Sequence, residues 1–150
     1  MTTIILTIIG ILLAAAAALM VIFYGGDAFN SGSVGAQANT YQNAGTNVIA
    51  AVQLAKADAQ DLSAVATVAD LVAIKTGAYL KESPALPDGS VTSLNSSRFT
   101  AEVTGGVDVC ARINENLKNG MVGTEATATA GKKMGCFTDA TNGETFFANL

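Results

Sequence analysis

The first 24 residues form an apolar stretch without a charged side chain. The stretch reads MTTIILTIIGILLAAAAALMVIFY, with one glycine and no proline. As an α-helix it would be about 36 Å long, at about 1.5 Å per residue, which exceeds the roughly 30 Å hydrocarbon core of a bilayer. The pattern therefore predicts a membrane-spanning helix.

A secretory signal peptide is the alternative interpretation of this stretch. It is disfavoured because no basic residue precedes the apolar run, the run is too long, and no small-residue cleavage site separates it from polar sequence. The first basic residue of the chain is Lys56, so no positive charge beside the span orients it in a membrane. We therefore expect Met1 to be the processed N-terminus of a precursor whose basic leader has been removed.

A second hydrophobic pattern follows, with spacings that alternate between four and three residues. Its members are Val34, Ala38, Tyr41, Gly45, Val48, Val52 and Ala55, and Ile49 and Leu54 broaden it. This spacing predicts an amphipathic helix that packs along another element and ends between Lys56 and Gln60.

Two glycines, Gly25 and Gly26, lie between the two hydrophobic patterns. Because glycine lowers helix propensity by up to about 1 kcal/mol, we expect a flexible joint here, and Asp27 and Asn30 are the candidate caps if a new helix begins after it. Because the two patterns can be nearly collinear, we expect the second to be the amphipathic half of the same long helix, so that the first ~58 residues form one rod.

The remaining sequence predicts short elements. We expect a helix from Thr67 to Ile74, capped by Thr67 and ended by Gly77, and a strand from Arg98 to Val103. The other expected elements are a loop at 81–97, a helix at 109–117, an exposed loop or weak strand at 123–133, and a hairpin at Asn142-Gly143.

These elements predict an α+β chain in three parts. Residues 1–26 are the hydrophobic helix and its joint, residues 27–60 are the amphipathic half of the same helix, which packs on the head, and residues 61–150 are a globular head. The head is expected to contain short helices and an antiparallel sheet.

The composition argues against catalysis and against nucleic-acid binding. The 150 residues include no His and no Trp, and 8 basic against 12 acidic residues give a net charge of −4. The commonest general base and metal ligand is thus missing, and the surface repels phosphate backbones on average. Two pairs of carboxylates are candidates for acid–base chemistry, Asp58 with Asp61 and Glu102 with Asp108, but nothing in the sequence around them predicts a cleft. We expect no enzyme activity and no cofactor.

The two cysteines, Cys110 and Cys136, lie in the polar part of the chain. An even pair beyond a membrane span favours a disulfide, which persists on the exported side. Two buried free thiols are the alternative, and a metal site is less favoured because it needs His or further Cys.

Small residues occur at four-residue intervals inside the apolar stretch. Gly10, Ala14 and Ala18 would form a narrow flank where another helix approaches closely, beside bulkier surface from Leu6, Ile9, Leu13 and Met20. A lone helix in lipid, without a partner, is the alternative.

Taken together, these residues resemble those of a type IV pilin, in particular the type IVb group that includes conjugative thin pili. The resemblance lies in the charge-free helix that opens at Met1, the amphipathic continuation over residues 34–55, and the late cysteine pair. The segment LVAIKTGAYLKESPALP at residues 71–87 also looks like the helix and proline-containing turn of such heads.

The resemblance implies which residues assemble the filament. A prepilin peptidase would remove the leader before Met1, and Cys110–Cys136 would enclose a C-terminal variable loop. The implied polymerisation core is Met1, Ile5, Leu6, Ile9, Gly10, Leu13, Ala14 and Ala18. One departure is Ile5, where the family usually has a glutamate thought to neutralise a neighbouring amino terminus.

The implied function is that of a major pilin, the structural subunit of an extracellular type IV pilus. Its partners would be copies of itself in a helical filament, the inner membrane before assembly, and the pilus assembly machinery, with no nucleic acid bound directly. The alternatives are a membrane-tethered minor pilin or pseudopilin-like assembly factor, and a soluble binding domain on a signal anchor. In each case the loops at 84–97 and 121–135 are the expected partner-facing surfaces.

Overall fold

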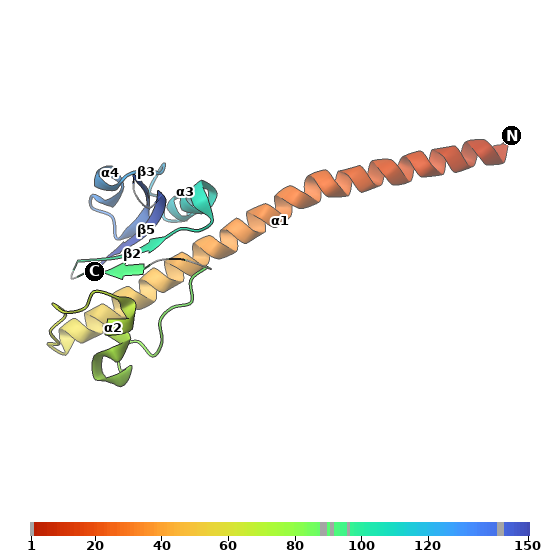
Figure 1. Ribbon diagram of the computed structural model, residues 1–150. Helices are drawn as coiled ribbons and strands as arrows, with labels where there is room; N and C mark the ends of the chain where they lie inside the picture. Colours follow the sequence, from red (N-terminus) through yellow and green to blue (C-terminus); the bar gives the residue numbers. More distant parts are fainter. Residues whose placement is uncertain (1, 88–89, 91, 96, 141–142) are drawn as a thin grey trace. The chain divides into compact units, whose positions relative to one another are not determined.

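The computed structural model describes residues 2–87, 90, 92–95, 97–140 and 143–150. Its architecture is α+β, as predicted: one long helix precedes short helices and a five-stranded sheet (Figure 1). The helices are α1 (Thr2–Ala57), α2 (Val68–Ala73), the 3-10 helix η1 (Ile74–Thr76), α3 (Gly106–Asn116) and α4 (Glu125–Thr129). The strands are β1 (Thr92–Leu94), β2 (Arg98–Glu102), β3 (Gly123–Thr124), β4 (Met134–Asp139) and β5 (Gly143–Asn149).

The chain divides into two compact units, residues 1–33 and residues 34–150. Helix α1 runs through both, and Gly25, Gly26, Asp27 and Asn30 lie inside it. The prediction of one long N-terminal helix is therefore confirmed, and a new helix capped by Asp27 or Asn30 is excluded. The physical reason is that two glycines cost only about 1 kcal/mol each relative to alanine, which the long helical runs on either side of them offset.

In the second unit, the buried face of α1 follows the predicted spacing. Ala38, Tyr41, Gly45, Val48, Val52 and Ala55 are buried, Val34 and Ile49 are partly buried, and α1 ends at Ala57 within the predicted range. Leu54 is an exception, because its side chain is 57% exposed. The prediction that Leu54 broadens the buried face is wrong.

Gly45 lies in close contact with side chains of the sheet. A Cβ added to it would lie 2.7 Å from Cζ of Phe146 and 3.2 Å from Sδ of Met134. The Phe146 ring also packs against Tyr41, with ring centroids 6.0 Å apart, and against Phe99 at 6.3 Å. The core of the head thus forms where α1 meets β2, β4 and β5.

The sheet has the strand order β1-β2-β5-β4-β3. Neighbouring strands are antiparallel except β3 and β4, which are parallel, so the expected antiparallel sheet is in fact mixed. Strand β1 lies in the segment predicted to be loop, and α4 lies in the segment predicted to be loop or weak strand. Three residues of β1 and five of α4 are too few to show a hydrophobic period in the sequence.

Other local predictions are confirmed. Thr67 caps α2 through a capping box with Asp70, and Gly77 follows η1 with a φ of 84°. Strand β2 alternates as expected, with Phe99 and Ala101 buried. Strands β4 and β5 pair as an antiparallel hairpin, from Asp139 opposite Gly143 to Met134 opposite Ala148. Asn142, in the predicted turn, lies outside the described residues.

Candidate functional site

The apolar half of α1 is the candidate assembly surface. It belongs to a helix that is long and apolar enough to cross a membrane, and within the described residues nothing covers its most apolar window. The exposed fractions are 57% for Ile5, 66% for Leu6, 50% for Ile9 and 67% for Leu13. A helix with such a surface on all sides is stable only in lipid or against other apolar surfaces.

Small residues on this helix leave room for close approach. Ala14 and Ala18 are exposed, and a Cβ added to Gly10 would meet no atom within 4 Å. The three small residues of the predicted core are therefore exposed at the surface of the helix. Met1, predicted to be the processed N-terminus and part of that core, lies outside the described residues.

The predicted joint has helical backbone. A Cβ added to Gly25 or Gly26 would also meet nothing within 4 Å, so within the described chain neither glycine is required by a close contact. Flexibility at this pair stays a prediction.

The cysteine pair forms the predicted disulfide. Cys110 of α3 and Cys136 of β4 are bonded, their Cα atoms are 5.3 Å apart, and both are fully buried. The sulfurs lie near the Glu144 carboxylate, but because they are bonded to each other they offer no thiolate to a metal ion. The disulfide links α3 covalently to the sheet. The segment of chain between the two cysteines, which the disulfide closes into a loop, contains β3 and α4.

Asn114 reinforces this link, and sequence reasoning missed it. Its amide Nδ2 donates to the carbonyl oxygen of Cys136 at 2.9 Å, and the Cys136 N–H donates back to Oδ1 at 2.9 Å. Asn114 is only 2% exposed. Its position four residues after Cys110, on the inner face of α3, is the one sequence feature that could have pointed to it.

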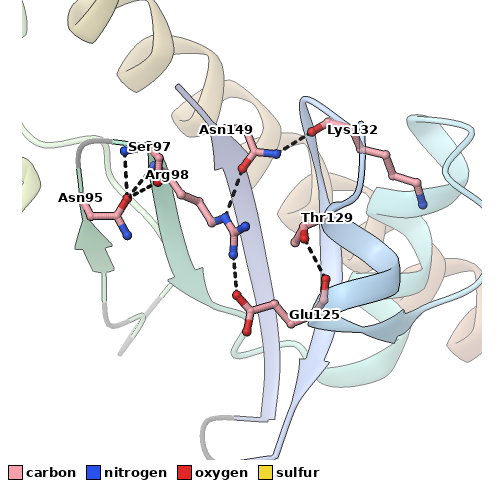
Figure 2. Close-up of polar contacts among 7 residues, drawn as sticks. All are labelled: Asn95, Ser97, Arg98, Glu125, Thr129, Lys132 and Asn149. Atoms are coloured by element: carbon pink, nitrogen blue, oxygen red, sulfur yellow. Dashed lines mark hydrogen bonds and ion pairs between the residues drawn. The ribbon is translucent and has the colours of Figure 1, made fainter.

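Arg98 joins the region enclosed by the disulfide to the rest of the sheet (Figure 2). Its Nε donates to Oδ1 of Asn149 at 3.1 Å, its Nη1 forms an ion pair with Glu125 of α4, and its guanidinium lies 5.9 Å from the Phe147 ring centroid. Asn149 in turn donates from Nδ2 to the Lys132 carbonyl oxygen. These contacts hold α4 and the turn after it on the face of the sheet that carries Phe137 and Phe147.

On the opposite face of the sheet, hydrogen bonds of Tyr41 link α1 to the end of β2. Its hydroxyl donates to the Glu102 carbonyl oxygen at 3.0 Å and accepts from the Thr104 N–H at 3.2 Å. The Ser90 hydroxyl lies 2.7 Å away and acts as the donor, because the single proton of Tyr41 is already used.

The carboxylates of one candidate pair, Asp58 and Asp61, accept hydrogen bonds from different neighbours. Asp58 accepts from the Tyr79 hydroxyl at 2.8 Å and from Lys75 at 3.5 Å, and these contacts, Tyr79 first, hold the pKa of Asp58 below its ordinary value. Asp61 accepts from the Ser63 N–H at 2.9 Å, which lowers the pKa of Asp61. The hydrogen bond between Tyr41 and Glu102 is to the backbone carbonyl oxygen of Glu102 and does not involve the Glu102 carboxylate.

Comparisons with protein-family models, with curated protein sequences and with solved structures found no match to this chain.

Proposed function

We propose that this chain is the major subunit of a type IV pilus, which leaves the inner membrane and polymerises outside the cell through its N-terminal helix. The observation that carries the proposal is the uncovered apolar half of α1, joined in one chain to a packed α+β head with a disulfide. This combination is consistent with a pilin-like fold.

The driving force would be burial of this surface among copies. At about 25 cal/mol per Å², covering roughly 400 Å² of apolar surface per subunit contributes about 10 kcal/mol before the cost of ordering. A head-to-tail interface that does not close produces an open helical filament. Ile5 is compatible with such packing, since an uncharged helix needs no ion pair to be buried among its copies.

The experiment must separate assembly from membrane insertion. Gly10→Leu keeps the helix apolar but fills the open surface at this position, so we expect normal membrane levels of the protein and loss of long fibres from sheared cell-surface fractions. Leu13→Lys should reduce both, because a charge at a helix centre opposes insertion by about 3 kcal/mol. Leu13→Met is the matched control and should give wild-type fibres.

The outcome also distinguishes the alternatives. Thin fibres containing this chain as their main subunit, seen by electron microscopy with subunit mass, support a major pilin. If wild-type cells hold the chain only in membranes, without fibres, the proposal is wrong and a membrane-tethered minor pilin or assembly factor is favoured.

A further inference from the structure

A groove of about 540 Å³ lies in the head between α1 and the segment after η1. The α1 wall contributes Thr40, Asn43, Ala44 and Asn47, and the other wall is residues 80–85. Its volume falls within the roughly 300–1,000 Å³ typical of ligand sites. All lining residues belong to the unit of residues 34–150, and none of them takes part in the contacts described above for the disulfide or for Arg98.

The α1 wall presents two amide side chains one helical turn apart. Neither Asn43 nor Asn47 forms a side-chain hydrogen bond with any described residue, and both are exposed. Each amide offers a donor and an acceptor side by side, which matches the N–H and C=O of a peptide unit. Their rise along the helix is about 6 Å, close to the roughly 6.7 Å that two residues of an extended chain span.

The other wall is irregular, and its backbone groups have no hydrogen-bond partner among the described residues. Residues 83–86 have no regular secondary structure, and the backbone of residues 81–85 forms no hydrogen bond with the rest of the described chain. Pro84 lacks an N–H, but the remaining N–H and C=O groups are available to pair with the backbone of a bound peptide.

The charge of the groove indicates what kind of peptide fits. Helix α1 has no charged residue between Asp27 and Lys56, so its wall is neutral. On the facing wall Lys81 and Glu82 have opposite charges, and neither is in an ion pair within the described residues. Apolar lining comes from Ala44, Leu80 and Pro84. A charged ligand would gain no net attraction here.

From these observations we propose that the groove binds an extended, uncharged peptide segment of a partner protein. Asn43 and Asn47 pair with the backbone of alternate peptide residues, and the backbone of residues 81–85 pairs with its other edge. All residues of this site lie in the unit of residues 34–150, so the site does not depend on whether the chain forms filaments.

Titration followed by NMR tests the site on the full-length ¹⁵N-labelled chain in detergent micelles. The probe is the capped hexapeptide acetyl-Ala-Thr-Ala-Thr-Ala-Thr-amide. We expect saturable shifts confined to residues 40–47 and 80–85. The same peptide N-methylated at alternate residues should bind at least about threefold more weakly, because it cannot donate those backbone hydrogen bonds.

Matched variants assign the recognition to the two amides. Asn43→Ala and Asn47→Ala should each weaken peptide binding about three- to tenfold. Asn39→Ala removes another exposed amide one turn earlier on α1, outside the groove, and should bind the peptide as the wild type does.

Four results would overturn the proposal. They are the absence of saturation up to about 5 mM peptide, equal binding of the N-methylated peptide, tighter binding of maltotriose at the same residues, and shifts that follow protein concentration instead of peptide. The third result would make the groove a carbohydrate site, and the fourth would make it an interface between copies of this chain.

Discussion

Asn114 and Cys136 exchange two hydrogen bonds, both at 2.9 Å, inside the core of the head. The Asn114 amide thereby satisfies the N–H and C=O of a residue that also forms the disulfide to the same helix. Helix α3 and strand β4 are thus joined by a covalent link and a polar link one turn apart.

Replacing Asn114 with alanine should destabilise the head strongly. The substitution leaves the buried N–H and C=O of Cys136 without this partner, and each unsatisfied group costs about 1–3 kcal/mol. We expect a loss of roughly 2–4 kcal/mol, measured by urea unfolding of the oxidised chain in micelles. Asn116→Ala, on the exposed side of the same helix, is the control and should change stability by less than about 0.5 kcal/mol.

Removing the disulfide should cost a comparable amount through the unfolded state. For a sequence separation of 26 residues, the chain-entropy model gives about 3.5 kcal/mol. The double variant Cys110→Ser with Cys136→Ser should unfold at correspondingly lower urea, and a reductant should lower the stability of the wild type but not of the variant. A wild type that is indifferent to full reduction would contradict this expectation.

Replacing each of two glycines of α1 with alanine should change the stability in opposite directions. Gly45→Ala would place a Cβ 2.7 Å from the Phe146 ring, and such overpacking costs about 1–3 kcal/mol. Gly35→Ala meets nothing within 4 Å and should stabilise the helix by about 0.5–1 kcal/mol. Thermal unfolding of both variants measures the two changes in stability. If both variants were stabilised, or both destabilised, this would be evidence against the packing of α1 on β5.

Periodic features of this chain are readable from the sequence because they repeat. The spacing of Tyr41, Val48 and Val52 predicts the buried face of α1, and the Thr67–Asp70 pair predicts the start of α2, since both depend on local geometry. The prediction for Leu54 is wrong because this residue lies roughly 130° around the helix from the centre of that face, at 3.6 residues per turn.

Contacts between distant segments are not readable in this way. Arg98 and Glu125 are far apart in the sequence, and only the folded sheet brings β2 beside α4. The groove at Asn43 likewise depends on where residues 80–85 pass along α1. Polar side chains in exposed or irregular segments have no period that would point to their partners.

Stability of the head should fall in acid partly through Asp58. The Tyr79 hydroxyl, and then Lys75, hold the pKa of Asp58 below its ordinary value of 3.8. A carboxyl whose folded pKa is lowered contributes stability above the unfolded pKa and loses it as the pH falls through the folded pKa. The urea midpoint should therefore decrease from about pH 5 to pH 2. Asp61 and Asp70, whose pKa values are also lowered, contribute with the same sign.

Asp58→Asn and Tyr79→Phe should each flatten this acid dependence. Tyr79→Phe removes only the hydroxyl that donates to Asp58 at 2.8 Å, so it tests the named cause without removing the carboxylate. Part of the dependence should remain because of Asp61 and Asp70. An unchanged profile in both variants would assign the acid sensitivity to other groups.

The pair Gly25 and Gly26 should matter for fibres more than for the isolated chain. Each Gly→Ala change stabilises a helix by up to about 1 kcal/mol, and neither new Cβ meets an atom within 4 Å. If the helix must stretch or unwind here during assembly, as the proposed pilus function requires of a joint, Gly25→Ala with Gly26→Ala should slow amide exchange at residues 23–30 in micelles. The same variant should reduce the yield or elasticity of sheared fibres at normal membrane levels.

Gly32→Ala, an equally open glycine of α1, is the control for helix stabilisation outside the joint. Fibres of the double variant that match those of the Gly32→Ala control in yield and extension would rule out a joint at this position.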